Sequence, residues 1–495
     1  MKLTAKLAKK MYDFNKDSET HLLVELEAPK VELTEERSPI CVIPILDISG
    51  SMAGDKLDYL QKACRKLIDH LAPGDYMGVV AYDSAVYEVA PVREVTQEQK
   101  ENLKKDISKL RSGSATNMSG GLLKALEWIN KMDLPDGTVL RVILFTDGHA
   151  NVGIRGRDLI GVVSEQKDRA TVSAFGFGND CNQELLADIA ARGDGNYAFI
   201  DSADAALTAF GRELGGLMTT YAQNIKIHIS PDKNNEIVEI LNDEDVVEDG
   251  KAAIVGLRDI LGEEKKWVVA KIKLSKVEKP LPRKVNALQI VVEYMDKDGK
   301  SQKLSKYAVK VNLCKAGEES SEEDSDVVKH RDRLLASKAQ EQAEIYARTG
   351  DFAAARLALS NCSGSIADSN VKSLLGNLSA NYSVASYSGT RGLSNSVRSR
   401  LKGKRVSYTS GEADSLYCDI GVQTLEAMNV VADSFTNDKT DISTVTTTTG
   451  SEKPTDNSKT VTRVTIGHPT KTGSVDITDE EEKSTAVKKR TKMDW

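Results

Sequence analysis

Segment 41–52 of the chain, CVIPILDISGSM, joins an apolar half to a polar half. The apolar half has the length of a strand, and an uninterrupted apolar run is typical of a parallel strand that is buried on both faces. The polar half then lies where this strand leaves the sheet, at its carboxyl end, which is the edge at which open α/β sheets bind ligands. Asp47, Ser49 and Ser51 alternate along the turn, so their oxygens lie on one side of it and suit a hard cation such as Mg²⁺.

Two further segments follow the same order of regular element and oxygen-bearing loop. Segment 113–122, GSATNMSGGL, places Thr116 just before an amphipathic helix, and the apolar run VLRVILFTDG over 139–148 leads to Asp147. Any single string of this kind is also typical of an ordinary turn. The agreement of three separate loops therefore favours a binding site.

These three motifs, DISGSM, SATN and FTDG, resemble the metal-ion-dependent adhesion site of a von Willebrand factor A domain. The resemblance implies one divalent cation, Mg²⁺ or else Mn²⁺ or Ca²⁺, held by Asp47, Ser49, Ser51, Thr116 and Asp147. It also implies that one or two of these side chains act through bound water, and that a partner protein supplies an acidic residue as the last ligand. Because only two of the five residues are charged, the ion is expected to favour an incoming anion. A folded A domain whose site is empty or only stabilising is the alternative.

Composition narrows the class of protein. The chain has 495 residues, a net charge of −7 at pH 7 and six cysteines without C-x-x-C spacing. This mild acidic balance does not favour nucleic acid or an anionic membrane as the main partner. The scattered cysteines are typical of reduced thiols, and the sequence shows neither a secretory h-region nor a run of about 18 apolar residues. We therefore expect a cytoplasmic protein without a membrane span.

The order of predicted elements divides the chain into domains. Strands alternate with helices throughout 40–218, which predicts an α/β domain with a parallel, doubly wound sheet of Rossmann-like topology. Short alternating strands without helices predict an antiparallel β-sandwich over 222–315. An early strand over 20–32 is expected to complete that sandwich, so that the A domain is inserted in it, and residues 1–19 are expected to form an N-terminal arm. The layout resembles bacterial A-domain proteins and inter-alpha-trypsin-inhibitor heavy chains.

The remaining residues predict an acidic linker with a helical hairpin over 317–386 and a tail over 388–495. In the hairpin sequence YARTGDFAAARLAL, Gly350 is placed to end one helix and Asp351 to cap the next. A single copy favours a docking or packing element over a repeat array. The tail is rich in Ser and Thr and, outside a short piece over 414–434, low in apolar residues, which predicts that it is mostly disordered.

No Rossmann, P-loop, zinc-protease or nucleophile-elbow motif occurs in the chain, so we expect no enzymatic activity. The favoured function is a non-enzymatic binding or scaffolding protein whose cation captures a partner carboxylate. One alternative is a structural component of a large assembly, in which the ion is only a staple. A metal-dependent hydrolase that uses the ion to activate water is less favoured, because both site carboxylates would belong to the metal shell. The oligomeric state is not indicated.

Overall fold

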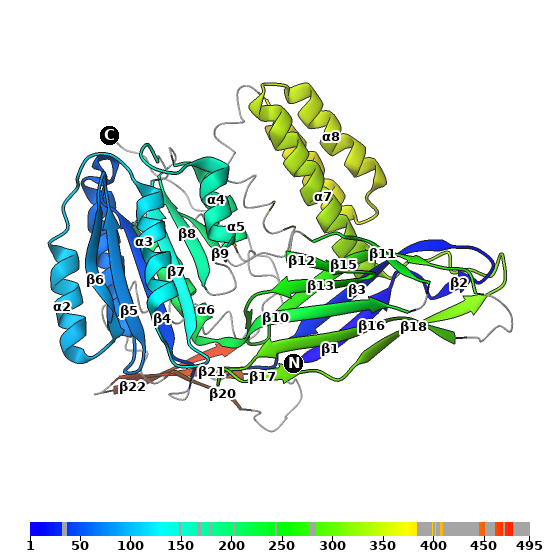
Figure 1. Cartoon of the computed structure of the whole chain (residues 1–495), viewed down its shortest axis with the longest axis horizontal. Coiled ribbons are helices and arrows are strands. Elements are labelled where there is room, and N and C mark those ends of the chain that lie inside the picture. The colour runs from blue at the N-terminus through cyan, green and yellow to red at the C-terminus, as the bar shows by residue number, and fades with distance from the viewer. Residues whose placement is uncertain are drawn as a thin grey trace.

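In the computed structural model, the chain forms an α/β domain, a β-sandwich and a helical unit that packs on the sandwich (Figure 1). The described residues are 1–31, 37–147, 150–165, 170–178, 181–200, 203–232, 234–242, 245–277, 284–383, 398, 401, 406–408, 445–450, 461–468 and 471–478.

The α/β domain is built on a seven-stranded sheet with the order β19-β9-β8-β7-β4-β5-β6. All neighbouring strands run parallel except β5 and β6, which form an antiparallel pair at one edge. The predicted α/β fold class is therefore confirmed. The strands are β4 (Ile40–Asp47), β5 (Tyr76–Tyr82), β6 (Val86–Glu94), β7 (Val139–Thr146), β8 (Thr171–Phe177), β9 (Asp194–Ile200) and β19 (Val406–Tyr408).

Helices cover both faces of this sheet, which explains the uninterrupted apolar run of β4. Every residue of β4 is buried. Ile40, Val42 and Leu46 belong to the core cluster beneath α1, α2 and α6, whereas alternate residues such as Ile43 and Ile45 belong to the cluster beneath α3, α4 and α5. The helices are α1 (Asp55–His70), α2 (Gln97–Ser108), α3 (Met118–Lys131), α4 (Gly156–Ser164), α5 (Gln183–Arg192) and α6 (Ala203–Met218), with a short 3₁₀ helix η1 (Gly50–Met52) after β4.

The sandwich consists of two sheets that enclose one apolar core. The first has the order β1-β3-β15-β11, and the second the order β12-β13-β10-β16-β18-β2, with β14 paired to β10 and β17 paired to β16. The strands are β1 (Lys2–Leu7), β2 (Met11–Asp13), β3 (Ser18–Glu27), β10 (Thr220–Pro231), β11 (Glu236–Ile240), β12 (Asp245–Asp249), β13 (Ala252–Leu257), β14 (Ile260–Leu261), β15 (Lys265–Leu274), β16 (Lys284–Met295), β17 (Ser301–Lys303) and β18 (Tyr307–Cys314).

Segments from before and after the α/β domain share these sheets. β3 pairs antiparallel with β15 along its whole length, from Ser18 opposite Leu274 to Glu27 opposite Lys265. The early strand thus spans Ser18–Glu27 rather than the expected 20–32. Residues 1–19 differ more from expectation: instead of an arm they form β1, which pairs with β3, and β2, which pairs with β18. The reason is that alternate apolar residues of β1 pack against the sandwich core.

A buried ion network joins the α/β domain to the sandwich. The guanidinium of Arg141, in β7, is only 2% exposed and contacts two carboxylates: Nη2 lies 2.8 Å from Asp259 Oδ2 and Nε lies 3.2 Å from Glu213 Oε1. Glu213, in α6, also accepts hydrogen bonds from Ser173 Oγ and Asn196 Nδ2, each at 2.6 Å. The network therefore connects β7, β8, β9 and α6 to the sandwich segment between β13 and β14.

The helical unit comprises α7 (Ser325–Arg348), α8 (Phe352–Ser365) and α9 (Ser369–Asn381). Gly350 has φ +82°, and the Asp351 side chain accepts the Ala354 N–H at 2.9 Å, so the two residues end α7 and cap α8 as their positions predict. α7 lies on the outer face of the first sheet, where His330 contacts the Trp267 ring at 4.3 Å between centroids.

Most of the expected tail, 388–495, lies outside the described residues, so its disorder stays a prediction. Its described parts contain strands that the sequence analysis did not predict: β19 pairs with β9, and β20 (Val445–Gly450), β21 (Val461–His468) and β22 (Lys471–Thr478) form an antiparallel sheet. These segments are rich in Val and Thr, whose β-branched side chains favour extended backbone. In the described part of the chain, no helix has the length and apolar character needed to cross a bilayer.

Candidate metal centre

The residues predicted to hold a cation lie at the carboxyl edge of the α/β sheet. Asp47 is the last residue of β4, and Asp147 directly follows β7. These two strands are parallel neighbours, so their carboxyl ends meet at the same edge. Ser49 and Ser51 belong to the turn and 3₁₀ helix after β4, and Thr116 lies two residues before α3.

Backbone hydrogen bonds hold the Thr116 loop beside the turn after β4. The Gly113 N–H donates to the Ile48 carbonyl at 2.6 Å, and the Gly50 N–H donates to the Ser114 carbonyl at 2.9 Å. α3 approaches the sheet closely because Gly121 has no side chain; a Cβ there would lie 2.6 Å from a ring carbon of Tyr82. The three predicted loops are therefore brought together at one place.

Asp47 is fully buried, and hydrogen bonds occupy both of its carboxylate oxygens. Oδ1 accepts the Ser49 N–H at 2.8 Å, and Oδ2 accepts the Thr146 hydroxyl at 2.6 Å and the Tyr82 hydroxyl at 3.3 Å. Burial raises the pKa of Asp47, and the nearby Asp147 carboxylate raises it further, although the hydrogen bonds from Ser49 and Thr146 oppose this. A cation beside the two carboxylates would relieve this penalty.

Asp147 is also fully buried, but its hydrogen bonding is incomplete. Its Oδ2 lies 3.3 Å from Nζ of Lys56, in the first turn of α1. Its Oδ1 is buried and has no hydrogen-bond partner. Burying a carboxylate oxygen without a hydrogen-bond partner costs free energy of folding. A bound cation at this oxygen would account for its burial.

The three hydroxyl residues complete the edge with different degrees of exposure. Ser49 and Thr116 are buried, whereas Ser51 is exposed. The Ser49 and Ser51 hydroxyls lie 3.1 Å apart, so their side chains face each other as the alternation predicts. The candidate centre thus has a buried floor and an open rim.

Four further residues shape this centre and were missed by sequence reasoning. Tyr82 and Thr146 donate to Asp47, Lys56 pairs with Asp147, and Asn151 fixes the loop by accepting the Thr116 N–H at 2.8 Å. Thr146 stands next to Asp147 in the FTDG motif, which is the one local signal that could have identified it. The others depend on which strands become neighbours.

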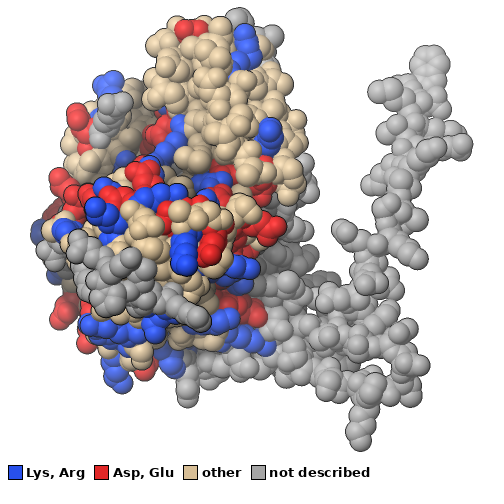
Figure 2. Space-filling view, turned by 90° about the vertical axis from the view of Figure 1, so that its right-hand side faces the viewer, with Lys and Arg blue, Asp and Glu red and all other residues tan. Residues whose placement is uncertain are grey.

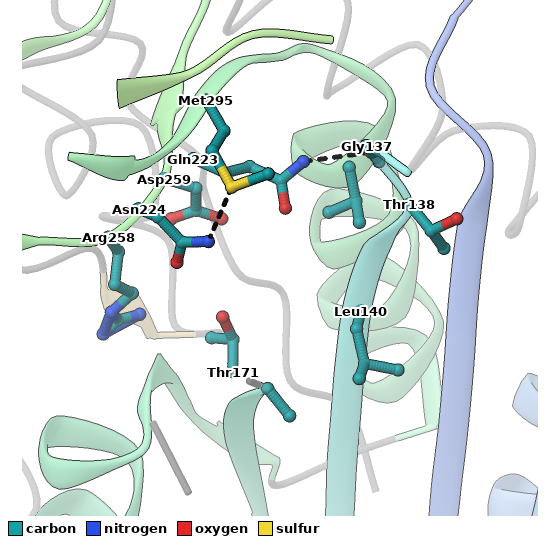
Figure 3. Close-up of a pocket in the computed structure, with 11 residues that line it drawn as sticks. Gly137, Thr138, Leu140, Thr171, Gln223, Asn224, Arg258, Asp259 and Met295 are labelled. Atoms are coloured by element: carbon teal, nitrogen blue, oxygen red, sulfur yellow. Dashed lines mark hydrogen bonds between the residues drawn. The ribbon is translucent and has the colours of Figure 1, made fainter. Parts of the chain in front are cut away.

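A cavity of about 110 Å³ lies away from this centre, at the amino-terminal ends of β7 and β8 where they meet the sandwich (Figure 3). Gln223 Nε2 donates to the Gly137 carbonyl at 3.1 Å, and Asn224 Nδ2 lies 3.3 Å from Met295 Sδ. The cavity belongs to the joint between the two domains and shares no residue with the predicted cation site.

The donor set of the centre fits a hard cation. Asp47 and Asp147 provide two carboxylates, and three hydroxyls lie on the same edge of the sheet. Mg²⁺ prefers such oxygen ligands and keeps several waters, so few carboxylates are needed. Among the described residues, no three His, Cys, Asp or Glu side chains form a cluster that could hold a metal ion, so the candidate centre depends on its hydroxyls as well as its two carboxylates.

Comparison with known proteins supports the assignment of the α/β domain. Residues 42–212 match the model of the von Willebrand factor type A domain. An uncharacterised protein of Escherichia coli (strain K12), YfbK, is 29% identical over 43% of this chain and 37% of its own. Inter-alpha-trypsin inhibitor heavy chain H1 of Bos taurus is 30% identical over 35% of this chain and 20% of its own. The chain thus spans less than half of the length of these relatives.

Two solved structures have a similar fold over about four fifths of the chain. A von Willebrand factor type A protein from Catenulispora acidiphila superposes with a TM-score of 0.61 at 15% identity, covering 80% of this chain and 89% of its own. The ArnB paralog VWA2 from Sulfolobus acidocaldarius superposes with a TM-score of 0.56 at 15% identity, covering 81% and 97%. The similarity extends well beyond 42–212, and together with the family match it shows that this chain carries a von Willebrand factor type A domain.

Proposed function

We propose that the chain is a non-enzymatic binding or scaffolding protein in which a divalent cation at the edge of the A domain captures a carboxylate of a partner protein. The unpartnered Oδ1 of Asp147 carries this proposal, because it is a buried carboxylate oxygen beside Asp47, whose two oxygens both accept hydrogen bonds. A von Willebrand factor type A domain typically mediates protein–protein interaction, which agrees with this assignment. Mg²⁺ is the preferred ion, with Mn²⁺ or Ca²⁺ as alternatives.

The hydrogen bonds suggest different roles for the two carboxylates. Asp147 has a free oxygen and is proposed to contact the ion directly. Both Asp47 oxygens already accept hydrogen bonds from protein groups, so Asp47 is proposed to act through water. Ser49, Ser51 and Thr116 supply neutral oxygens. When bound, the ion would supply a positive charge at the rim that attracts a partner carboxylate.

The residues around Asp47 favour binding over hydrolysis. A hydrolase of this kind would need a group that removes a proton from an ion-activated water. Burial raises the pKa of Tyr82 well above its usual value, so its hydroxyl stays protonated and continues to donate to Asp47. Asp47 and Asp147 would both belong to the ligand shell of the ion, so neither would be available as that proton acceptor.

A pull-down from native lysate tests the proposed function. With Mg²⁺ present, the wild-type chain is expected to retain a partner that is lost on adding a chelator and in the Asp147→Asn variant. Charge reversal of single Asp and Glu residues on the identified partner should then remove binding at one position. Retention of the same partners by the chelated protein and by the variant would contradict metal-bridged capture.

The alternative of a structural component in a large assembly makes a different prediction. If the chain is such a component and the ion only stabilises its fold, the purified chain should self-associate. Its sedimentation coefficient should then rise with protein concentration. A concentration-independent sedimentation coefficient favours the binding function.

Lys56 is expected to weaken ion binding, because its ammonium pairs with the carboxylate that the ion would use. The Lys56→Met variant should therefore bind Mg²⁺ more tightly, by up to about fivefold, since a partly exposed pair contributes about 0.2–1 kcal/mol. Isothermal titration calorimetry of both proteins measures the change. Lys62→Met, an exposed lysine on the same helix, is the control and should leave the Kd unchanged. Equal or weaker binding by Lys56→Met would show that the ammonium does not compete.

The state of the cysteines indicates the redox character of the compartment in which the protein is found. The five described cysteines are free thiols, and Cys41, Cys64, Cys181 and Cys314 are buried. Burial raises the pKa of the Cys41 thiol to about 12, so it stays protonated and unreactive. Free thiols are typical of a reducing compartment, and we propose a cytoplasmic location on this basis.

A further inference from the structure

A groove of about 390 Å³ runs between the two sheets of the sandwich, at the side where β1 and β18 lie. Ala5 and Leu7 line one wall, and Val309 and Val311 line the other, so the floor is apolar. The groove is also lined by five lysines and a single carboxylate: Lys6, Lys9, Lys10, Lys284, Lys310 and Asp324. Figure 2 shows Lys and Arg side chains gathered along the lower rim of this end of the molecule, below the helical unit.

Both walls of the groove are strand edges that no further strand covers in the part of the chain that the structure describes. β1 is the edge strand of its sheet, and β3 is its one strand partner among the described residues. β18 pairs with β16 on one side, and on the other it meets β2 only over Asn312–Cys314. Within the described ranges, no second strand therefore pairs with the backbone of β18 over 307–311. Such edges are the places at which an extended peptide adds to a sheet.

Most of the lysines of the groove are not neutralised by the described residues. Lys10, Lys284 and Lys310 are exposed, and none has an ion pair in the described part of the chain. Lys6 differs, because it pairs with Asp326 at the start of α7. The open groove thus combines an apolar floor with a rim of positive charge.

The chain's own acidic linker, over 317–324, binds the N-terminal segment beside this groove. Its Ser320 hydroxyl accepts the Met11 N–H at 3.1 Å, and its Asp324 N–H donates to the Ala8 carbonyl at 2.7 Å. Glu319 of the same linker pairs with Lys16 at 2.6 Å. Main-chain hydrogen bonds and lysine–carboxylate pairs are therefore already used together on the N-terminal segment.

We propose that the groove between β1 and β18 is a docking site for an extended acidic segment of a partner protein, which adds as a strand to one of the two open edges. Because side chains alternate along a strand, the segment places apolar residues on the floor and carboxylates at the lysine rim. This surface belongs to the sandwich and requires no ion. It is therefore a second interaction site, independent of the proposed cation site.

A fluorescent peptide of alternating Glu and Val residues, added to the full chain in the presence of chelator, tests the proposal. Saturable binding is expected at low salt, and the Kd should rise at least about tenfold in the Lys10→Glu/Lys310→Glu variant, since attraction becomes repulsion. The control variant Lys62→Glu/Lys105→Glu makes the same charge change on exposed lysines of α1 and α2 and should bind as wild type.

A second peptide distinguishes strand addition from charge attraction alone. The same sequence with alternate backbone nitrogens methylated keeps every charge but cannot form a strand pair along its edge. It should bind the wild-type chain at least about tenfold more weakly. Equal affinity of the two peptides, or equal affinity of the groove and control variants, overturns the proposal. Absence of binding by the unmodified peptide also overturns it.

Discussion

Mg²⁺ is expected to raise the unfolding temperature of the wild-type α/β domain and to leave that of the Asp147→Asn variant unchanged. The ion stabilises the fold that binds it, by about 2.7 kcal/mol when its concentration is 100 times the Kd. For a domain of this size, the shift is roughly 5–10 °C. The variant keeps the shape of the side chain but loses the charge of the buried, unpartnered oxygen. Differential scanning calorimetry with and without Mg²⁺ measures the effect.

The Asp147→Asn variant should fold without Mg²⁺, because the substitution also removes the repulsion between Asp147 and the neighbouring buried Asp47 carboxylate. Asp58→Asn, which removes an exposed carboxylate from α1, is the matched control and should keep the full Mg²⁺ response. An Asp147→Asn protein that is stabilised by Mg²⁺ as strongly as wild type would remove this residue from the proposed ligand set.

The sequence predicted the α/β domain well because its signals are local. A short uninterrupted apolar run followed by a turn is typical of a central strand, and each core cluster takes alternate residues of β4. The turn after β4 carries its oxygens in its own sequence, so Asp47, Ser49 and Ser51 could be placed together before the fold was known. Whether they bind an ion stays a prediction.

The features that sequence reasoning missed depend on contacts between distant segments. Tyr82 reaches Asp47 only because β5 lies beside β4, and no local pattern marks this. The basic residues of MKLTAKLAKK concealed the alternation of Leu3, Ala5 and Leu7, which makes β1 a strand. A single Arg within the apolar run VLRVILF was a usable signal of a buried ion pair, but its partners Glu213 and Asp259 lie about 70 and about 120 residues away along the chain.

Replacement of this arginine is expected to destabilise the chain strongly. The Arg141→Met variant keeps an apolar stem of similar length but removes the positive charge that Arg141 places beside the buried Glu213 and Asp259 carboxylates, and loss of one partner of a buried ion pair costs about 3–5 kcal/mol. Because the network joins β7 to the sandwich, both domains should lose stability. Urea unfolding followed by circular dichroism measures the change, with Lys131→Met on the exposed face of α3 as the control that leaves the midpoint unchanged.

A triple variant separates uncompensated charge from lost packing. If the cost arises from the loss of positive charge beside the two carboxylates, Arg141→Met combined with Glu213→Gln and Asp259→Asn should recover much of the lost stability, because neutral groups are far less costly to bury than charges. Glu213→Gln keeps one acceptor oxygen for Ser173 but turns an NH2 group toward Asn196 Nδ2, so the Glu213→Gln single variant is measured beside it to give the cost of that lost hydrogen bond. A triple variant as unstable as Arg141→Met alone would place the cost in packing and geometry, and would show that Arg141 holds the two domains together by its shape rather than by its charge.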